Sequence, residues 1–240
     1  MKSEPLEFEV DGLKLRGNFY GPAPPAKKLA VLFIHGWTGL PNDSAAEFLA
    51  RHGYISMTFS LSGHNNSDGR LKDQTRQKSL KEVLAAYDFF KSKLPVGARV
   101  VSAGNSYGGY LATLLSTERP LAAIQMRVPA NYPDARFSAQ QLNQGSPDPD
   151  AMFWRQKELG PDVTRSLKAL HNFNGEVQII EAEADEHVPH QTVQNYVNAI
   201  VDKSKLDYHL MKDCSHSLGL DKERNRQYQQ LTLDWLDKLA

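Results

Sequence analysis

A serine flanked by glycines lies between a strand-like segment and a helix-like segment of this 240-residue chain. Ser106 is the central residue of a Gly-x-Ser-x-Gly pentapeptide at 104–108, with an apolar run at 99–104 and a helix-forming run at 107–118. Glycines at these positions allow a strand-to-helix turn too tight for bulky neighbours, and such a turn exposes the serine hydroxyl at the top of a sheet. The pattern predicts that Ser106 is a nucleophile.

A serine hydroxyl attacks a carbonyl only with a base in hydrogen-bond reach and a third group that orients this base. His216 follows the last predicted strand, and Asp185 follows the strand before it. Because loops after parallel strands open at the same sheet edge, we expect Ser106, Asp185 and His216 to converge. Asp185 is preferred because it follows its strand, whereas Glu181 is expected within a strand and Asp213 at a strand end. The three competing carboxylates are Glu181, Glu183 and Asp213.

Acyl transfer also requires hydrogen-bond donors for the oxygen that becomes negative in the tetrahedral intermediate. The loop 35–39 follows the first buried strand and opens at the same edge as Ser106. Its Trp37 N–H and the Tyr107 N–H are predicted to form this oxyanion hole. His35 is interpreted as a structural part of the turn rather than as a base.

The elements that must position these residues alternate between strand and helix along most of the chain, which is typical of an α/β fold with a mostly parallel, doubly wound sheet. An Asp-Gly turn at 11–12 predicts an antiparallel hairpin at the sheet edge. The expected strands are 6–10, 13–20, 29–34, 55–59, 99–104, 122–128, 176–182 and 206–211, and the expected helices are 44–52, 75–93, 107–118, 190–203 and 221–239.

The proline-rich and amide-rich segment 129–172 interrupts this alternation. We interpret it as a short lid or cap inserted into a single domain that comprises residues 1–240. Arg155 in this segment, together with Arg127 and Arg136, is a candidate for binding an acidic substrate group, although structural or solvated roles are favoured.

Composition excludes several classes of function. Lys+Arg and Asp+Glu are both 28, so zero formal net charge argues against nucleic acid or an anionic membrane as the main partner. We expect no membrane span, and the acidic N-terminal segment without an apolar run suggests a cytoplasmic protein. Cys214 is the only cysteine and is expected to be buried, and no residue spacing indicates a metal or cofactor.

The chain resembles the α/β-hydrolase superfamily, near the small carboxylesterases and the dienelactone-hydrolase-like or serine-aminopeptidase-like proteins. The resemblance rests on the His-Gly turn at 35–36, the elbow at 104–108, the Asp-x-x-Val-Pro segment at 185–189 and His216. It implies the α/β-hydrolase fold, with these segments as oxyanion loop, nucleophile, triad acid and triad base. The segment 60–67 departs from the family pattern, because it retains Gly, His and Ser but lacks the acid, the arginine and one glycine.

These observations predict a serine esterase, with no cofactor, that cleaves carboxylic or thioesters of small to medium acyl groups through an acyl-enzyme on Ser106. Two alternatives stay open. The first is an amide- or peptide-cleaving member of the same superfamily, and the second is a hydrolase-like protein that binds a ligand without turnover. The substrate groups and the oligomeric state do not follow from the sequence.

Overall fold

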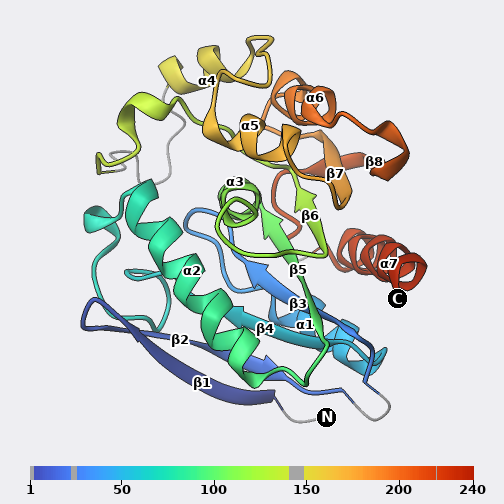
Figure 1. The fold of residues 1–240 in the computed structure, drawn as a ribbon. Coiled ribbons are helices and arrows are strands. Elements are labelled where there is room, and N and C mark those ends of the chain that lie inside the picture. The colour runs from blue at the N-terminus through green and yellow to red at the C-terminus, as the bar shows by residue number, and fades with distance from the viewer. Residues whose placement is uncertain (1–2, 23–25, 141–148, 220) are drawn as a thin grey trace.

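One mixed sheet organises the computed structural model, which describes residues 3–22, 26–140, 149–219 and 221–240. Within these residues the sheet has eight strands in the order β1-β2-β4-β3-β5-β6-β7-β8 (Figure 1). The two pairs that involve β2 are antiparallel, and every other neighbouring pair is parallel. The strands are β1 (Ser3–Val10), β2 (Leu13–Tyr20), β3 (Leu29–Ile34), β4 (Ile55–Phe59), β5 (Arg99–Asn105), β6 (Ala123–Arg127), β7 (Glu176–Ala184) and β8 (Leu206–Ser215).

Helices cover both faces of the sheet, as the sequence predicts. One face carries α2 (Arg76–Lys93), α3 (Tyr107–Leu115), α5 (Arg165–His171) and α6 (His190–Ala199), and the other carries α1 (Asp43–Arg51) and α7 (Lys222–Leu239). The short helices are α4 (Pro149–Arg155) and the 3-10 turns Leu71–Asp73, Asp134–Arg136 and Lys203–Lys205.

The central strand β3 is apolar at every position because both of its faces are buried. Ala30, Leu32 and Ile34 belong to the core beneath α2 and α3, whereas Val31 and Phe33 belong to the core beneath α1 and α7. This division follows from the two-residue period of a strand. The sheet therefore separates two hydrophobic cores and fixes the edge at which its parallel strands end.

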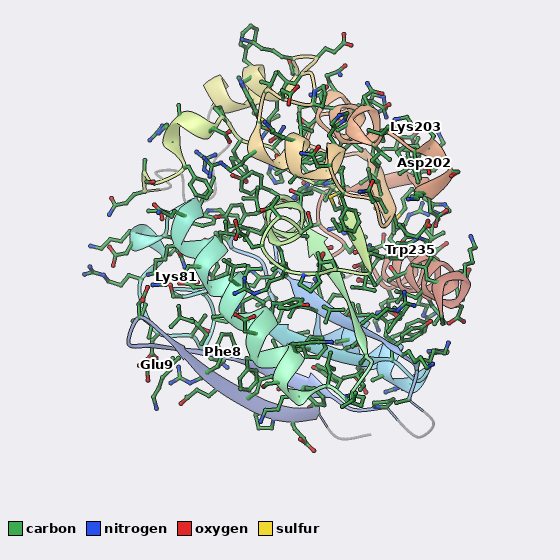
Figure 2. The ribbon with its side chains drawn as sticks, viewed as in Figure 1. Phe8, Glu9, Lys81, Asp202, Lys203 and Trp235 are labelled. Carbon is green, nitrogen blue, oxygen red and sulfur yellow. The ribbon has the colours of Figure 1, made fainter. Side chains whose placement is uncertain are left out.

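The antiparallel hairpin β1–β2 forms one edge of the sheet, as predicted. Phe8 on β1 lies beneath α2, and its ring stacks on Phe89 at a centroid distance of 5.2 Å (Figure 2). Lys81 on α2 reaches across to Asp11 in the hairpin turn, with 2.5 Å between Nζ and Oδ1. These contacts attach the hairpin to the helical layer.

At the C-terminal end of the sheet, two predicted boundaries differ from the structure by four residues each. The helix predicted at 190–203 ends at Ala199, and Asp202 then accepts the Ser204 N–H at 3.1 Å to begin a 3-10 turn. Strand β8 continues four residues beyond the predicted 206–211, to Ser215. A register shift opposite Ala182 and Ala184 accommodates the extra length, and Asp213 takes a φ of 48° there.

The predicted lid segment 129–172 contains a helix of the main core. Leu167 and Leu170 of α5 are 0% and 1% exposed, and α5 packs against α3 and α6. Its N-terminus is capped by Thr164, whose hydroxyl accepts the Leu167 N–H at 3.3 Å. The prediction of a cap therefore applies only to the part of the segment that precedes α5. Residues 141–148 of that part lie outside the described residues.

None of the helices in the described part of the chain has both the length and the apolar character needed to cross a bilayer.

Candidate active site

Ser106 lies at the junction of β5 and α3 in a backbone conformation that is unusual for a non-glycine residue, with φ 51° and ψ −112°. A Cβ atom at Gly104 would lie 2.2 Å from the Gly108 carbonyl oxygen, and one at Gly108 would lie 2.0 Å from the Ile34 carbonyl oxygen. Only glycine permits this approach of strand, turn and helix. The structure thus contains the sharp turn that the pentapeptide predicts.

Asp185 and His216 form a hydrogen-bonded pair. The His216 Nδ1 atom lies 2.8 Å from Asp185 Oδ2, and the two side chains are only 15% and 5% exposed, in that order. Asp185 Oδ1 also accepts the backbone N–H groups of His187 and Val188, at 2.8 and 2.7 Å. The carboxylate is therefore fixed by its own loop and holds the imidazole with the proton on Nδ1, which leaves the Nε2 lone pair available to accept a proton.

Of the three carboxylates that compete with Asp185 in the sequence, two are engaged elsewhere, and the third, Asp213, is exposed at the end of β8. Glu181 is 3% exposed in β7 and contacts His190 Nδ1 at 2.6 Å. Glu183 accepts from Lys212 Nζ at 2.6 Å and from the Asp213 N–H at 3.0 Å. The geometry therefore favours Asp185 as the partner of the histidine.

The loop after β3 lies against Ser106. A Cβ atom on Gly36 would lie 3.4 Å from Ser106 Cβ. Among the described residues, no hydrogen bond is donated by the backbone N–H of Trp37 or by that of Tyr107. Tyr107 is also the first residue of α3, where backbone N–H groups have no partner within the helix and favour negative charge.

His35 connects this loop to the segment after β4. Its Nδ1 lies 2.7 Å from the Gly36 carbonyl oxygen, and its Nε2 accepts the Leu61 N–H at 3.0 Å. Complete burial, with a smaller contribution from the neighbouring His64, lowers the pKa of His35 to about 4. Both ring nitrogens are thus used, which agrees with a structural rather than a catalytic role.

The rings of Trp37 and Tyr107 pack against each other edge-on, with centroids 5.4 Å apart. The Tyr107 side chain is 0% exposed, and burial raises its pKa well above the usual value. Its hydroxyl is therefore a neutral group of the core, and the backbone N–H is the part of Tyr107 suited to chemistry.

Two charged side chains form hydrogen bonds with the backbone of His216 that the sequence does not predict. Glu186 Oε2 accepts the His216 N–H at 3.1 Å, and Arg127 Nη2 donates to the His216 carbonyl oxygen at 2.8 Å. Arg127 is 5% exposed, so it does not present a free guanidinium to an acidic substrate group. No motif signals either contact, because each depends on how the ends of separate strands lie in space.

The hydrogen bonds among the described residues do not include one between Ser106 Oγ and His216 Nε2. In proteins without bound substrate this bond is often long or poorly aligned, and it tightens in the complex. The described residues at this sheet edge thus include a hydroxyl, an imidazole held by a carboxylate and two backbone N–H groups without a protein acceptor, which are the kinds of group that acyl transfer requires.

This combination of sheet order, nucleophile turn and helical layers defines the α/β-hydrolase superfamily of serine hydrolases. More specifically, the chain belongs to the prolyl oligopeptidase family, whose model matches residues 42–240. No curated protein sequence matches the chain.

Solved structures share this fold over nearly the whole chain. Est1E from Butyrivibrio proteoclasticus, in a structure with ferulic acid bound, is 21% identical with a TM-score of 0.77, and 98% of each chain is covered. An alpha-beta serine hydrolase homologue from Coxiella burnetii is 17% identical with a TM-score of 0.72, also over 98% of each chain. A lidless serine hydrolase, XC6422 from Xanthomonas campestris, has a TM-score of 0.66 at 17% identity and covers 98% of this chain and 95% of its own.

Proposed function

We propose that the chain hydrolyses carboxylic esters, or thioesters, of small to medium acyl groups through an acyl-enzyme on Ser106. The observation that carries the proposal is the largely buried Asp185–His216 pair, with 2.8 Å between Nδ1 and Oδ2, at the sheet edge where Ser106 precedes α3. Such a pair has a purpose in acyl transfer, because it fixes the imidazole tautomer that accepts a hydroxyl proton.

In the proposed reaction, Ser106 Oγ attacks the acyl carbon while His216 Nε2 takes its proton. The N–H groups of Trp37 and Tyr107 stabilise the oxyanion, and loss of one such donor typically costs about 3–4 kcal/mol of transition-state stabilisation. The imidazolium of His216 then protonates the departing alcohol. Water attacks the acyl-enzyme with His216 as base, which releases the acid and regenerates Ser106.

We also propose that the segment before α5 forms a cap over this site. In its support, Arg155 of α4 donates through Nε to the Asn131 carbonyl oxygen at 3.3 Å and through Nη1 to the His187 carbonyl oxygen at 3.2 Å. His187 lies two residues after Asp185, and its ring meets the His216 ring edge-on at a centroid distance of 4.9 Å. Helix α4 is thus attached to the loop that carries the proposed acid.

The family match favours a second candidate, an amide or peptide hydrolase. The two activities share the same covalent mechanism and differ in the leaving group. A panel of p-nitrophenyl esters of increasing chain length, hydroxycinnamate esters and aminoacyl-anilides separates them. We include hydroxycinnamate esters because Est1E, which has a similar fold, has been solved with ferulic acid bound. Anilide turnover above ester turnover would replace the esterase proposal.

Labelling with a fluorophosphonate tests the nucleophile directly. We expect the wild-type protein to be labelled and Ser106→Ala to remain unlabelled. A wild-type protein that is neither labelled nor active on any member of the panel would instead support a binding function without turnover. Ser116→Ala, at the end of α3, is a matched control that removes a serine distant from the proposed chemistry and keeps labelling intact.

A further inference from the structure

Arg127 contacts both the proposed nucleophile and the proposed base. Its backbone carbonyl oxygen accepts the Ser106 N–H at 2.8 Å, and its Nη2 donates to the His216 carbonyl oxygen at 2.8 Å. Residues 106 and 216 are far apart in the chain and have no strand in common. A single residue at the end of β6 therefore connects the two loops whose relative position decides whether proton transfer is possible.

Among the described residues, the Arg127 guanidinium is buried and has no salt-bridge partner. Its side chain contacts no carboxylate oxygen within 4.0 Å in the described part of the chain, and its Nε and Nη1 atoms there are buried without a hydrogen-bond acceptor. The guanidinium lies over the Tyr228 ring of α7, with 6.0 Å from Cζ to the ring centroid. Because an unpaired buried cation is expensive, packing alone favours an apolar residue of similar length at this position.

Two side chains of opposite charge form hydrogen bonds with the backbone of His216. Glu186 accepts the His216 N–H at 3.1 Å, while Arg127 donates to the His216 carbonyl oxygen. The residue directly follows β8 and lies outside any helix or strand, so no ladder of backbone hydrogen bonds fixes it. Hydrogen bonds to charged groups are about twice as strong as neutral ones, and here they replace that ladder.

The backbone that follows Arg127 is fitted closely to the nucleophile turn. Val128 is 0% exposed and has a φ of 45°, a conformation that is a genuine outlier for a β-branched residue. Its N–H donates to the Ile180 carbonyl oxygen at 2.8 Å, and the Ala130 N–H donates to the Ser106 carbonyl oxygen at 3.1 Å. The strained turn is therefore held on both sides and fixes where the Arg127 side chain begins.

We propose that Arg127 is a positioning residue that holds the loop of His216 in register with the turn of Ser106. The proposal rests on the proposed function, because it concerns the proton transfer between these two residues. In this role the guanidinium does not contact the substrate. The role explains why a buried cation donates a hydrogen bond to the carbonyl oxygen of His216. Displacement of a catalytic group by about 1 Å is known to lower the rate on the order of 100-fold.

The test compares Arg127→Met, which keeps the length and removes the donor, with Arg127→Lys, which keeps a charged donor. We expect kcat for the best ester of the panel to fall about 100-fold in R127M while KM changes less than about threefold. R127K is expected to be at least about tenfold faster than R127M. The rate of fluorophosphonate labelling should follow kcat, since it needs the same proton transfer.

Leu236→Ala on α7 is the control for a general loss of stability. Leu236 is 0% exposed in the core that also contains Tyr228, and it has no part in the proposed chemistry. Activities are compared where chemical denaturation shows each variant fully folded. A kcat for R127M within tenfold of the wild type, an equal loss in L236A, or an R127K no faster than R127M would each overturn the proposal. A wild type without labelling or turnover would instead remove the proposed function.

If R127M does not fold, the wild-type protein carries the test by NMR. We expect a slowly exchanging Arg127 Nη–H signal with a nuclear Overhauser contact to the backbone of residues 216–217, both before and after phosphonylation of Ser106. Rapid exchange of that proton, or absence of the contact, in either state would overturn the proposal.

Discussion

Replacement of Asp185 by asparagine changes one atom and, through it, the tautomer of His216. Asp185 Oδ1 accepts two backbone N–H groups, from His187 and Val188, and His216 Nδ1 lies 2.9 Å from Oδ1 and 2.8 Å from Oδ2. An asparagine that keeps its carbonyl oxygen toward the two N–H donors places its amide N–H₂ at the position of Oδ2, against Nδ1. We expect Nδ1 then to accept a hydrogen bond from this amide, so that the imidazole proton moves to Nε2 and blocks uptake of the Ser106 proton.

For a triad with the wrong tautomer, kcat falls about 10⁴-fold, which is about 5 kcal/mol of activation free energy. We expect this loss in the D185N variant, with KM for the ester changed little and the fold retained. The assay is steady-state hydrolysis of the best p-nitrophenyl ester, with circular dichroism to verify folding. Asp213→Asn is the matched control, because Asp213 is an exposed carboxylate of the neighbouring strand. If D185N kept more than a tenth of the wild-type kcat, the tautomer argument would be wrong. It would also be wrong if D213N lost more than nine-tenths of the wild-type kcat.

Three further predictions concern the framework of the site. Gly108→Ala, whose Cβ would lie 2.0 Å from the Ile34 carbonyl oxygen, should lower the free energy of unfolding by more than about 3 kcal/mol, whereas Gly160→Ala, with nothing within 4 Å, should change it by less than about 0.5 kcal/mol in urea denaturation. Because burial lowers the pKa of His35 from 6.5 to about 4, the unfolded chain binds a proton that the folded chain does not between these values, so stability should fall as the pH decreases. The full loss of unfolding free energy across this pH range is about 3 kcal/mol. The denaturant midpoint should therefore change less between pH 7 and pH 5 in His35→Gln than in the wild type. An equal change in the two proteins would contradict the argument. Burial also raises the pKa of Cys214, which is 2% exposed, so a disulfide reagent at pH 8 should label it slowly in the folded protein and rapidly in urea; fast labelling of the folded state would refute its burial.

Much of this architecture is predictable because it depends on local patterns. The apolar run 29–34 and the glycines around Ser106 specify a buried strand and a tight turn through sterics alone. The rule that parallel strands end at one edge then predicts that Asp185 approaches His216, although 31 residues separate them. Each of these inferences needs only neighbours in sequence or the period of one element.

The remaining features depend on contacts between elements. The extension of β8 to Ser215 arises where β7 and β8 change register, and no composition near Asp213 marks that shift. The prolines of segment 129–172 predict a lid that includes α5, but Leu167 of this helix belongs to the main core. The hydrogen bond from Arg127 to the His216 carbonyl oxygen likewise depends on where the ends of β6 and β8 lie, which a single sequence does not state.

The backbone of Ser106 has a consequence for how the chain tolerates substitution. A non-glycine residue with φ 51° and ψ −112° carries on the order of 1–3 kcal/mol of conformational strain. Glycine at this position relieves that strain, so Ser106→Gly should raise the melting temperature while abolishing turnover. The proposed nucleophile is thus also a residue that keeps the protein from being as heat-resistant as its fold allows.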